Sequence, residues 1–256
     1  MVKAVLALAL SVLPLWAGKP FIYQDGQVRL EGYLARPALV EGPVPGILVI
    51  HQWMGPTQHE QMTADRLAEL GYVALAADIY GEGVRPKDSK EASAQATLYK
   101  SNRLLYRHRI RLALEALKAQ ADVDPDRLAV VGFCFGGTGA LEAARAGLPV
   151  RAVVSLHGGL DYQPDLDPLA ITAKVLVCHG ADDPNVPPKD VAAFQDEMRK
   201  TKADYVFIAY GGAVHAFTQK EAGNDPSKGV AYQAAAAHRS WRHMKDFLAE
   251  ALAPQK

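Results

Sequence analysis

One cysteine in this sequence occupies a position where a thiol can act as a nucleophile. Residues 132–136 read Gly-Phe-Cys-Phe-Gly, between a β-branched run that ends at Phe133 and a helical stretch that follows. The glycines two residues before and after Cys134 permit a sharp strand-to-helix turn, because side chains there would collide with neighbouring backbone. The N-terminus of the following helix directs N–H groups and a partial positive charge at the sulfur, which favours the thiolate. The alternative is a glycine-rich turn of another kind, with Cys134 packed and inert.

A nucleophile of this type needs a base and a carboxylate that orients the base, and such a turn predicts the order nucleophile, acid, histidine along the chain. The run 182–184, Asp-Asp-Pro, follows a later predicted strand, and its proline stiffens the turn that carries Asp183. Asp182 is the rival candidate, and either aspartate could be an ordinary turn or capping residue. His215 lies in a glycine-rich loop after the next predicted strand. Three strand ends therefore supply the right residue types in the right order for catalysis by Cys134, Asp183 and His215.

The elements that must position these side chains alternate between strands and helices. Six runs are continuously apolar and β-branched, which is typical of strands buried on both faces: 46–50, 72–77, 128–133, 152–156, 174–178 and 205–209. Helical stretches are expected over residues 57–70, 90–119, 137–146, 190–200 and 232–252. This alternation predicts an α/β fold with a doubly wound, mostly parallel sheet and helices on both faces. Residues 27–34 alternate in polarity and predict an antiparallel edge hairpin before that sheet. Ligands bind at the carboxyl ends of strands in such sheets, where the three candidate residues lie.

The N-terminal segment differs in composition from the rest of the chain. Lys3 precedes a run from Ala4 to Trp16 that is apolar except for Ser11, and the small residues Ala17 and Gly18 follow. This pattern predicts a signal peptide over residues 1–17, because the run is shorter than the ~20 residues that span a bilayer. The alternative is an uncleaved amphipathic tail or a buried N-terminal helix. We therefore expect an exported protein, periplasmic or secreted, with a single domain over residues 18–256 and no stable membrane span.

Composition excludes several classes of protein. The 256 residues include 28 basic and 28 acidic side chains, and this neutral balance gives no support to a nucleic-acid partner. Two cysteines are too few for a disulfide scaffold or a cysteine-rich zinc module. The histidines near strand ends lack the spacing of metal ligands, so no metal and no cofactor are expected. An arginine stripe at helical spacing predicts a solvated helix face; its members are Arg103, Arg107 and Arg111.

The sequence motifs resemble those of the dienelactone hydrolase family of the α/β-hydrolase superfamily, over nearly all of residues 21–252. The matching segments are 51–55, 78–81, 132–137, 180–187 and 215–217. The resemblance implies an α/β-hydrolase fold and a triad of Cys134, Asp183 and His215 that acts on an ester or lactone carbonyl. It also implies an oxyanion hole formed by the backbone N–H groups of Phe135 and Trp53, which suit that role because backbone donors are rigid and aimed in advance.

The sequence departs from the family pattern at three places. Gln52 follows His51 where well-known family members carry a glutamate that helps form the thiolate. If Gln52 aligns with that glutamate, His215 must deprotonate the thiol itself. The dienelactone enzymes also hold a substrate carboxylate with two arginines, and this chain has Gly81-Glu82 and Gln219 at those places. Arg85 is near enough in sequence to substitute for one of them. The reaction class is therefore expected to be kept, and a different substrate is expected.

The predicted function is hydrolysis of a small-molecule carboxylic ester or lactone through a thioester acyl-enzyme, by a protein expected to be a monomer. Trp53 and Met54 are expected to give the pocket an apolar wall, with Gln52 beside them. One alternative is a non-catalytic exported binding protein that kept the fold; another is a redox or acyl-transfer role for Cys134. A redox cysteine usually has a resolving partner, and no Cys-x-x-Cys motif is present.

Two further expectations concern residues near strand ends. Cys178 is expected to be a small buried hydrophobe, and a disulfide with Cys134 is not expected. A strand between the two would place them about 9.5 Å apart, beyond the ~7 Å limit on the Cα separation. His157 and His179 each precede a glycine and are expected to shape the rim of the active site.

Overall fold

The computed structural model describes residues 18–39, 41–166 and 170–254. One eight-stranded sheet runs through them, in the order β1-β2-β4-β3-β5-β6-β7-β8. The strands are β1 (Lys19–Asp25), β2 (Val28–Ala35), β3 (Val44–Ile50), β4 (Val73–Ala77), β5 (Val123–Phe133), β6 (Ala152–Leu156), β7 (Lys174–Gly180) and β8 (Tyr205–Tyr210). The pairs from β4 to β8 are parallel, and β2 is antiparallel to both β1 and β4. The predicted doubly wound, mostly parallel sheet is therefore confirmed.

The central strands form where the sequence is apolar without alternation. Every residue of β4 and of β6 is buried, as expected when helices cover both faces of a parallel sheet. An antiparallel edge hairpin is present, but the segment 27–34 supplies only one of its strands, β2; this strand pairs with β1 from Lys19 and Leu34 to Asp25 and Val28. Its tight turn uses Gly26 at φ 58°.

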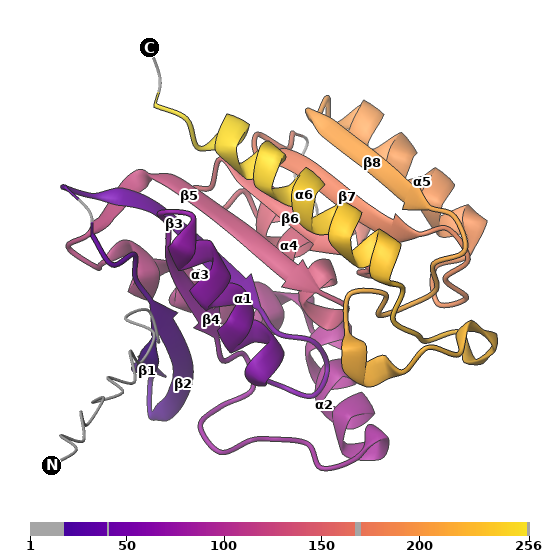
Figure 1. Ribbon diagram of the computed structural model, residues 1–256, viewed down its shortest axis with the longest axis horizontal. Coiled ribbons are helices and arrows are strands. Elements are labelled where there is room, and N and C mark those ends of the chain that lie inside the picture. The colour runs from indigo at the N-terminus through magenta and orange to yellow at the C-terminus, as the bar shows by residue number, and fades with distance from the viewer. Residues whose placement is uncertain (1–17, 40, 167–169, 255–256) are drawn as a thin grey trace, which may run out of the picture.

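Helices cover the two faces of the sheet (Figure 1). They are α1 (Gln58–Glu69), α2 (Ser89–Ser101), α3 (Arg103–Lys118), α4 (Phe135–Arg145), α5 (Pro188–Lys200) and α6 (Ala234–Ala251). Buried side chains of α1 and α6 share one apolar cluster with the strands, and those of α2, α3, α4 and α5 share the other. The sheet therefore lies between two separate cores.

The structure corrects the single helix expected over residues 90–119. The segment forms two helices, α2 and α3, with Asn102 between them. The Asn102 side chain accepts a hydrogen bond from the Leu105 N–H at 3.0 Å and thus caps α3. An asparagine that begins a new helix was overlooked because apolar residues continue at helical spacing beyond it.

The predicted arginine stripe is wrong for two of its three members. Arg111 is exposed, but the side chains of Arg103 and Arg107 are only 2% and 10% exposed. Both point at Glu142 on α4, with Arg107 Nε 2.7 Å and Arg103 Nη1 3.4 Å from its carboxylate oxygens. A carboxylate on a neighbouring helix, distant in sequence, therefore turns these cations inward.

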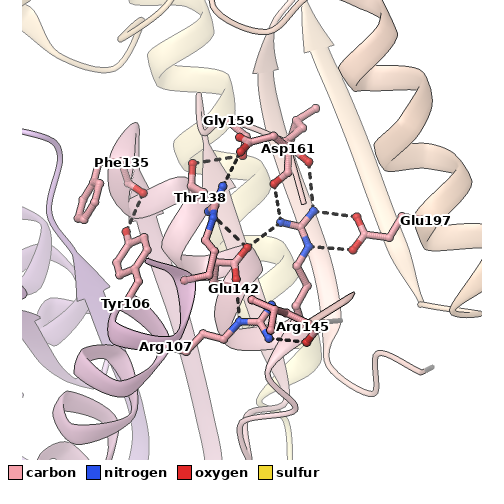
Figure 2. A network of polar contacts seen from close by, with 12 residues as sticks. Tyr106, Arg107, Phe135, Thr138, Glu142, Arg145, Gly159, Asp161 and Glu197 are labelled. Atoms are coloured by element: carbon pink, nitrogen blue, oxygen red, sulfur yellow. Dashed lines mark hydrogen bonds and ion pairs between the residues drawn. The ribbon is translucent and has the colours of Figure 1, made fainter. Parts of the chain in front are cut away.

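Glu142 belongs to a larger buried polar network (Figure 2). Arg145, also on α4, makes a bidentate pair with Glu197 of α5 at 2.8 and 2.7 Å and contacts Glu142 at 3.1 Å. The same guanidinium donates to the carbonyls of Leu160 and Asp161, and Arg103 is ion-paired with the Asp161 carboxylate. The network ties α3, α4 and α5 to the loop that follows β6. Each charge in it has an opposite charge beside it, as buried charges require.

No helix within the three described ranges is long and apolar enough to cross a membrane. The predicted signal peptide, residues 1–17, lies outside the described residues. The signal peptide and export of the protein therefore stay predictions.

Candidate active site

Cys134 lies at the sharp turn between β5 and α4, as the sequence predicts. Its backbone is left-handed at φ 54° and ψ −114°, a conformation that a residue with a side chain adopts only at an energetic cost. The Cys134 N–H stabilises this turn by donating both to the Leu156 carbonyl at 3.0 Å and to Nδ1 of His157 at 3.1 Å. The turn brings the sulfur to the carboxyl end of the sheet, where it is partly exposed.

The two flanking glycines are required by close approach of backbone. A Cβ at Gly132 would lie 1.8 Å from the Gly136 carbonyl oxygen, and a Cβ at Gly136 would lie 2.1 Å from the Ile50 carbonyl oxygen. Both distances are far below van der Waals contact. The turn therefore admits no side chain at either position, in agreement with the steric argument from the sequence.

His215 and Asp183 meet Cys134 at this turn. His215 Nε2 lies 3.0 Å from Cys134 Sγ, and His215 Nδ1 lies 2.8 Å from Asp183 Oδ2. Asp183 is buried and its other oxygen accepts the Asn185 N–H at 2.8 Å, whereas Asp182 is exposed. The geometry thus selects Asp183 over Asp182 as the partner of the histidine.

The loops that carry these side chains are fixed by backbone hydrogen bonds. The turn after β7 closes through the Asp183 N–H, which donates to the Gly180 carbonyl at 3.0 Å. The loop after β8 is held on both sides of His215, whose N–H donates to the Gly229 carbonyl at 3.2 Å and whose carbonyl accepts from Ala231 at 3.0 Å. The His215 loop is therefore held by bonds within residues 211–233 and by the Asp182 N–H, which donates to the Ala213 carbonyl at 2.9 Å.

Hydrogen bonding decides the charge of His215. Burial acts to lower the pKa of this imidazole, but its hydrogen bonds to Asp183 and Cys134, with the negative charges of both, raise the pKa to about 10. At neutral pH the ring is therefore an imidazolium. The Cys134 sulfur lies 3.0 Å from Nε2 of this cation, and Cys134 directly precedes the first residue of α4.

The sequence predicts that the backbone N–H groups of Phe135 and Trp53 form an oxyanion hole, and the structure shows how these two residues are held. Phe135 is the first residue of α4, so its N–H has no partner within the helix. The carbonyl groups of both residues accept a hydrogen bond from a tyrosine. Tyr106 donates to the Phe135 carbonyl at 2.8 Å, and Tyr80 donates to the Trp53 carbonyl at 3.0 Å. These two tyrosines were not identified from the sequence; they fix the carbonyl ends of both residues.

Gln52 is turned toward its own loop. Its side-chain oxygen accepts the Met54 N–H at 2.9 Å, and its backbone N–H donates to the carboxylate of Glu60 at 3.3 Å. Gln52 is buried, at 7% exposure, and lies on the wall of the cavity. The two hydrogen bonds of Gln52 thus hold the loop that carries Trp53.

A cavity of about 870 Å³ opens beside Cys134 and His215. One wall comes from the loop after β3, with Trp53 and Met54, as expected from the sequence. A second wall comes from α2, including Lys100, and a third from the segment after His215, residues 216–230. The α2 wall was missed because nothing in that amphipathic stretch distinguishes a pocket-facing side from a solvated one.

Arg85 is not among the residues that line this cavity. Its Nη1 donates to the carbonyls of Gly81 and Val84 at 3.0 and 2.9 Å and lies 3.5 Å from Asp78. The guanidinium thus closes the loop after β4. The expectation that Arg85 replaces a substrate-binding arginine is therefore wrong.

The two other strand-end histidines are buried. His157 is 0% and His179 is 5% exposed, so neither shapes an exposed rim, although His157 contacts the Cys134 backbone directly. Cys178 is fully buried, as expected. Cys134 directly follows β5 and Cys178 belongs to β7; β6 lies between these strands, and both cysteines are free.

The mostly parallel sheet, with a nucleophile turn after β5 and histidine and aspartate at later strand ends, is the arrangement of an α/β hydrolase. A family model described as "Dienelactone hydrolase family" matches residues 30–252. The chain therefore belongs to the dienelactone hydrolase family, and it is a hydrolase of esters or lactones.

Three relatives illustrate the similarity. A Bradyrhizobium protein named "Probable 2-oxo-3-(5-oxofuran-2-ylidene)propanoate lactonase" is 33% identical over 233 residues, which are 88% of this chain and 90% of the relative. The solved structure of m3DLH is 38% identical with a TM-score of 0.88, over 93% of this chain and 100% of that one. The dienelactone hydrolase-like promiscuous phosphotriesterase P91 from metagenomic libraries is 39% identical with a TM-score of 0.88, over 93% and 99% of the two chains.

Proposed function

We propose that the protein hydrolyses a small carboxylic ester or lactone through a covalent thioester on Cys134, with His215 and Asp183 as the other members of a triad. The observation that carries the proposal is the continuous contact from Sγ to Nε2 at 3.0 Å and from Nδ1 to Asp183 at 2.8 Å, at the wall of the cavity. Such a line of nucleophile, base and orienting acid is the signature of nucleophilic catalysis.

In the first half-reaction, the Cys134 thiolate attacks the carbonyl carbon and the carbonyl oxygen becomes an oxyanion. The N–H groups of Phe135 and Trp53 receive that oxygen, and one such donor contributes about 3 kcal/mol in related sites. Collapse of the tetrahedral intermediate breaks the carbon–oxygen bond of the ester. The proton on Nε2 of His215 goes to the departing alkoxide, which leaves as an alcohol, or as the free hydroxyl end of an opened lactone.

In the second half-reaction, water attacks the thioester. Neutral His215 takes a proton from that water through Nε2, and Asp183 stabilises the imidazolium that forms. The carbon–sulfur bond breaks, the acid is released, and the thiolate–imidazolium pair is restored. Gln52 takes no proton in this scheme because an amide cannot; its oxygen holds the Met54 N–H.

The substrate is proposed to be small and partly apolar. A cavity of about 870 Å³ is in the size range of small-molecule sites, and Trp53 and Met54 give it apolar surface. Lys100 is a basic side chain on its wall. The lactonase and phosphotriesterase names of the relatives make lactones and activated esters the first compounds to test.

The decisive experiment is turnover of 4-nitrophenyl acetate by the wild type beside Cys134→Ala, with Cys178→Ala as the control that removes the other thiol. We expect saturable turnover in the wild type and in the control, and at least a thousandfold loss in Cys134→Ala. Mass spectrometry after acid quench should find the acetyl group on the peptide that contains Cys134. Equal rates in the wild type and in Cys134→Ala would rule out the proposed nucleophile.

A further inference from the structure

A second histidine lies directly behind the nucleophile. His157 immediately follows β6, is completely buried, and has a left-handed backbone at φ 42°. A residue with a side chain keeps this conformation only where its surroundings impose it. No step of the proposed mechanism uses this imidazole, so its burial and strain need a separate explanation.

Both ring nitrogens of His157 are hydrogen-bonded. Nδ1 lies 3.1 Å from the Cys134 backbone N, whose N–H donates to it, so Nδ1 carries no proton. The proton of the neutral ring is therefore on Nε2, which lies 2.7 Å from Thr218 Oγ1 and donates to it. Burial, together with the charges of His215 and His59, holds the pKa of His157 well below its usual value. The ring stays neutral at the pH where His215 is charged.

These two bonds join the two halves of the reacting pair. Cys134 belongs to the turn after β5, and Thr218 lies three residues beyond His215 in the loop after β8. The His157 ring also packs edge-to-face against the His215 ring, with centroids 5.5 Å apart, and against Phe217 at 5.1 Å. His157 therefore spans the space between the backbone that holds the sulfur and the segment that holds the base.

The two halves differ in their secondary structure. The Cys134 turn is enclosed by a strand, a helix and glycines without room for side chains, whereas residues 211–233 contain only two short 3-10 turns. Within that loop, the backbone bonds of His215 go to Gly229 and Ala231 of the same segment. The bond from His157 to Thr218 ties this segment to the sheet right beside the base.

We propose that His157, through its hydrogen bond to Thr218, is a positioning residue that fixes Nε2 of His215 against Sγ of Cys134. This inference rests on the proposed function of Cys134 and His215. The side chain acts through the separation and direction of the pair and does not touch the substrate. The neutral tautomer is essential, because a protonated Nδ1 would face the Cys134 N–H donor and add a second positive charge beside His215.

The test compares Thr218→Val with Thr218→Ser. Valine matches the shape of threonine but removes the acceptor, and serine keeps the acceptor. Alkylation of Cys134 by iodoacetamide, followed across pH by mass spectrometry, reports how strongly His215 holds the thiolate, without need of turnover. We expect the midpoint of the pH–rate profile to rise by about one pH unit in Thr218→Val, with about tenfold slower alkylation on the acid limb and the wild-type rate at high pH.

Three comparisons complete the test. Thr218→Ser should restore the wild-type midpoint, and His157→Asn, which keeps an acceptor for the Cys134 N–H but cannot reach Thr218, should behave as Thr218→Val. Thr201→Val removes the same hydroxyl at the end of α5, where it bonds the Glu197 carbonyl at 2.8 Å, and should leave the midpoint unchanged. In turnover of 4-nitrophenyl acetate, kcat should fall in Thr218→Val while KM stays within about twofold.

Two outcomes would separate the possible errors. If Thr218→Val has the same midpoint and the same alkylation rates as the wild type, the positioning role is overturned. A loss of stability in urea without any change of midpoint would also overturn it and assign the bond to folding alone. Failure of the proposed function would be recognised differently, by full turnover in Cys134→Ala.

Discussion

The two ends of helix α4 differ in how far their polar and charged side chains are exposed and how completely they are paired. At its N-terminus, Cys134 and His215 lie partly exposed on the wall of a large cavity, and the sulfur has one hydrogen-bond partner among the described side chains. At its C-terminal half, Glu142 and Arg145 are completely buried and surrounded by matching partners (Figure 2). One helix thus joins an open pair, Cys134 and His215, to a closed cluster of ion pairs around Glu142.

This difference separates a group with free lone pairs, the Cys134 sulfur, from a group whose lone pairs are occupied, the Glu142 carboxylate. In the proposed reaction, Cys134 as a thiolate has one imidazolium partner and keeps lone pairs free to attack carbon. The Glu142 carboxylate accepts from three guanidinium groups, those of Arg103, Arg107 and Arg145, so its lone pairs are occupied. Incomplete pairing at one end therefore supports chemistry, and complete pairing at the other holds α4 in place relative to the loop after β6.

The largest effect is expected from changing Asp183, the carboxylate that contacts His215 of the open pair. Asp183→Asn keeps the shape of the side chain but removes the charge that orients His215 and stabilises its protonated form. We expect kcat/KM for 4-nitrophenyl acetate to fall about ten-thousandfold, as kcat does after the corresponding change in a serine protease. Asp182→Asn, the same change at the exposed neighbour, should keep kcat/KM within about twofold. Equal losses in the two variants would contradict the assignment of Asp183.

The closed cluster should respond in stability and leave catalysis intact. Glu142→Gln leaves three buried guanidinium groups short of a charge, and breaking a buried ion pair lowers the free energy of unfolding by about 3–5 kcal/mol. Urea denaturation measures this loss, with Glu115→Gln on the exposed face of α3 as the control. The kcat/KM of the folded fraction should stay within about threefold. A large fall in kcat/KM with unchanged stability would mean that the two ends of α4 are not separate in function.

The smallest effect concerns pH. Because the pKa of His215 is raised to about 10, its imidazolium proton is present at neutral pH and is lost as pH rises through that value. kcat/KM should therefore be level from about pH 7 to pH 9 and fall about tenfold for each pH unit well above 10. The measurement is a pH–rate profile corrected for spontaneous hydrolysis, with circular dichroism at each pH. A fall that begins near pH 7 would show that the hydrogen bonds to Asp183 and Cys134 do not hold the proton.

The sequence was informative where local rules decide the structure. The six apolar runs became strands within a few residues of their predicted bounds, and the Gly132 to Gly136 turn formed as steric arguments require. The order of Cys134, Asp183 and His215 also predicted their meeting, because parallel strands bring their carboxyl ends to one edge. The choice between the two neighbouring aspartates needed coordinates, since only these show which carboxylate faces the ring.

What the sequence could not predict depends on contacts between distant segments. Arg103 and Arg107 have the spacing of a solvated face, and only the carboxylate of Glu142, 35 residues or more away, draws them inside. His157 was expected at the rim, yet its contacts with Cys134 and Thr218 place it behind the nucleophile. No local pattern distinguishes a charged or polar side chain that faces solvent from one that meets a partner across the fold.

The walls of the cavity have a consequence for how such a protein diversifies. Five residues of these walls belong to neither core: Ser93, Thr97 and Lys100 on α2, and Glu221 and Ala222 in the loop after β8. Ala222 is half-buried, and the other four are exposed. Exposed positions tolerate substitution with little change in the free energy of folding. A lineage can thus exchange these side chains, and with them the range of accepted esters, while Cys134 and the residues that hold it stay unchanged.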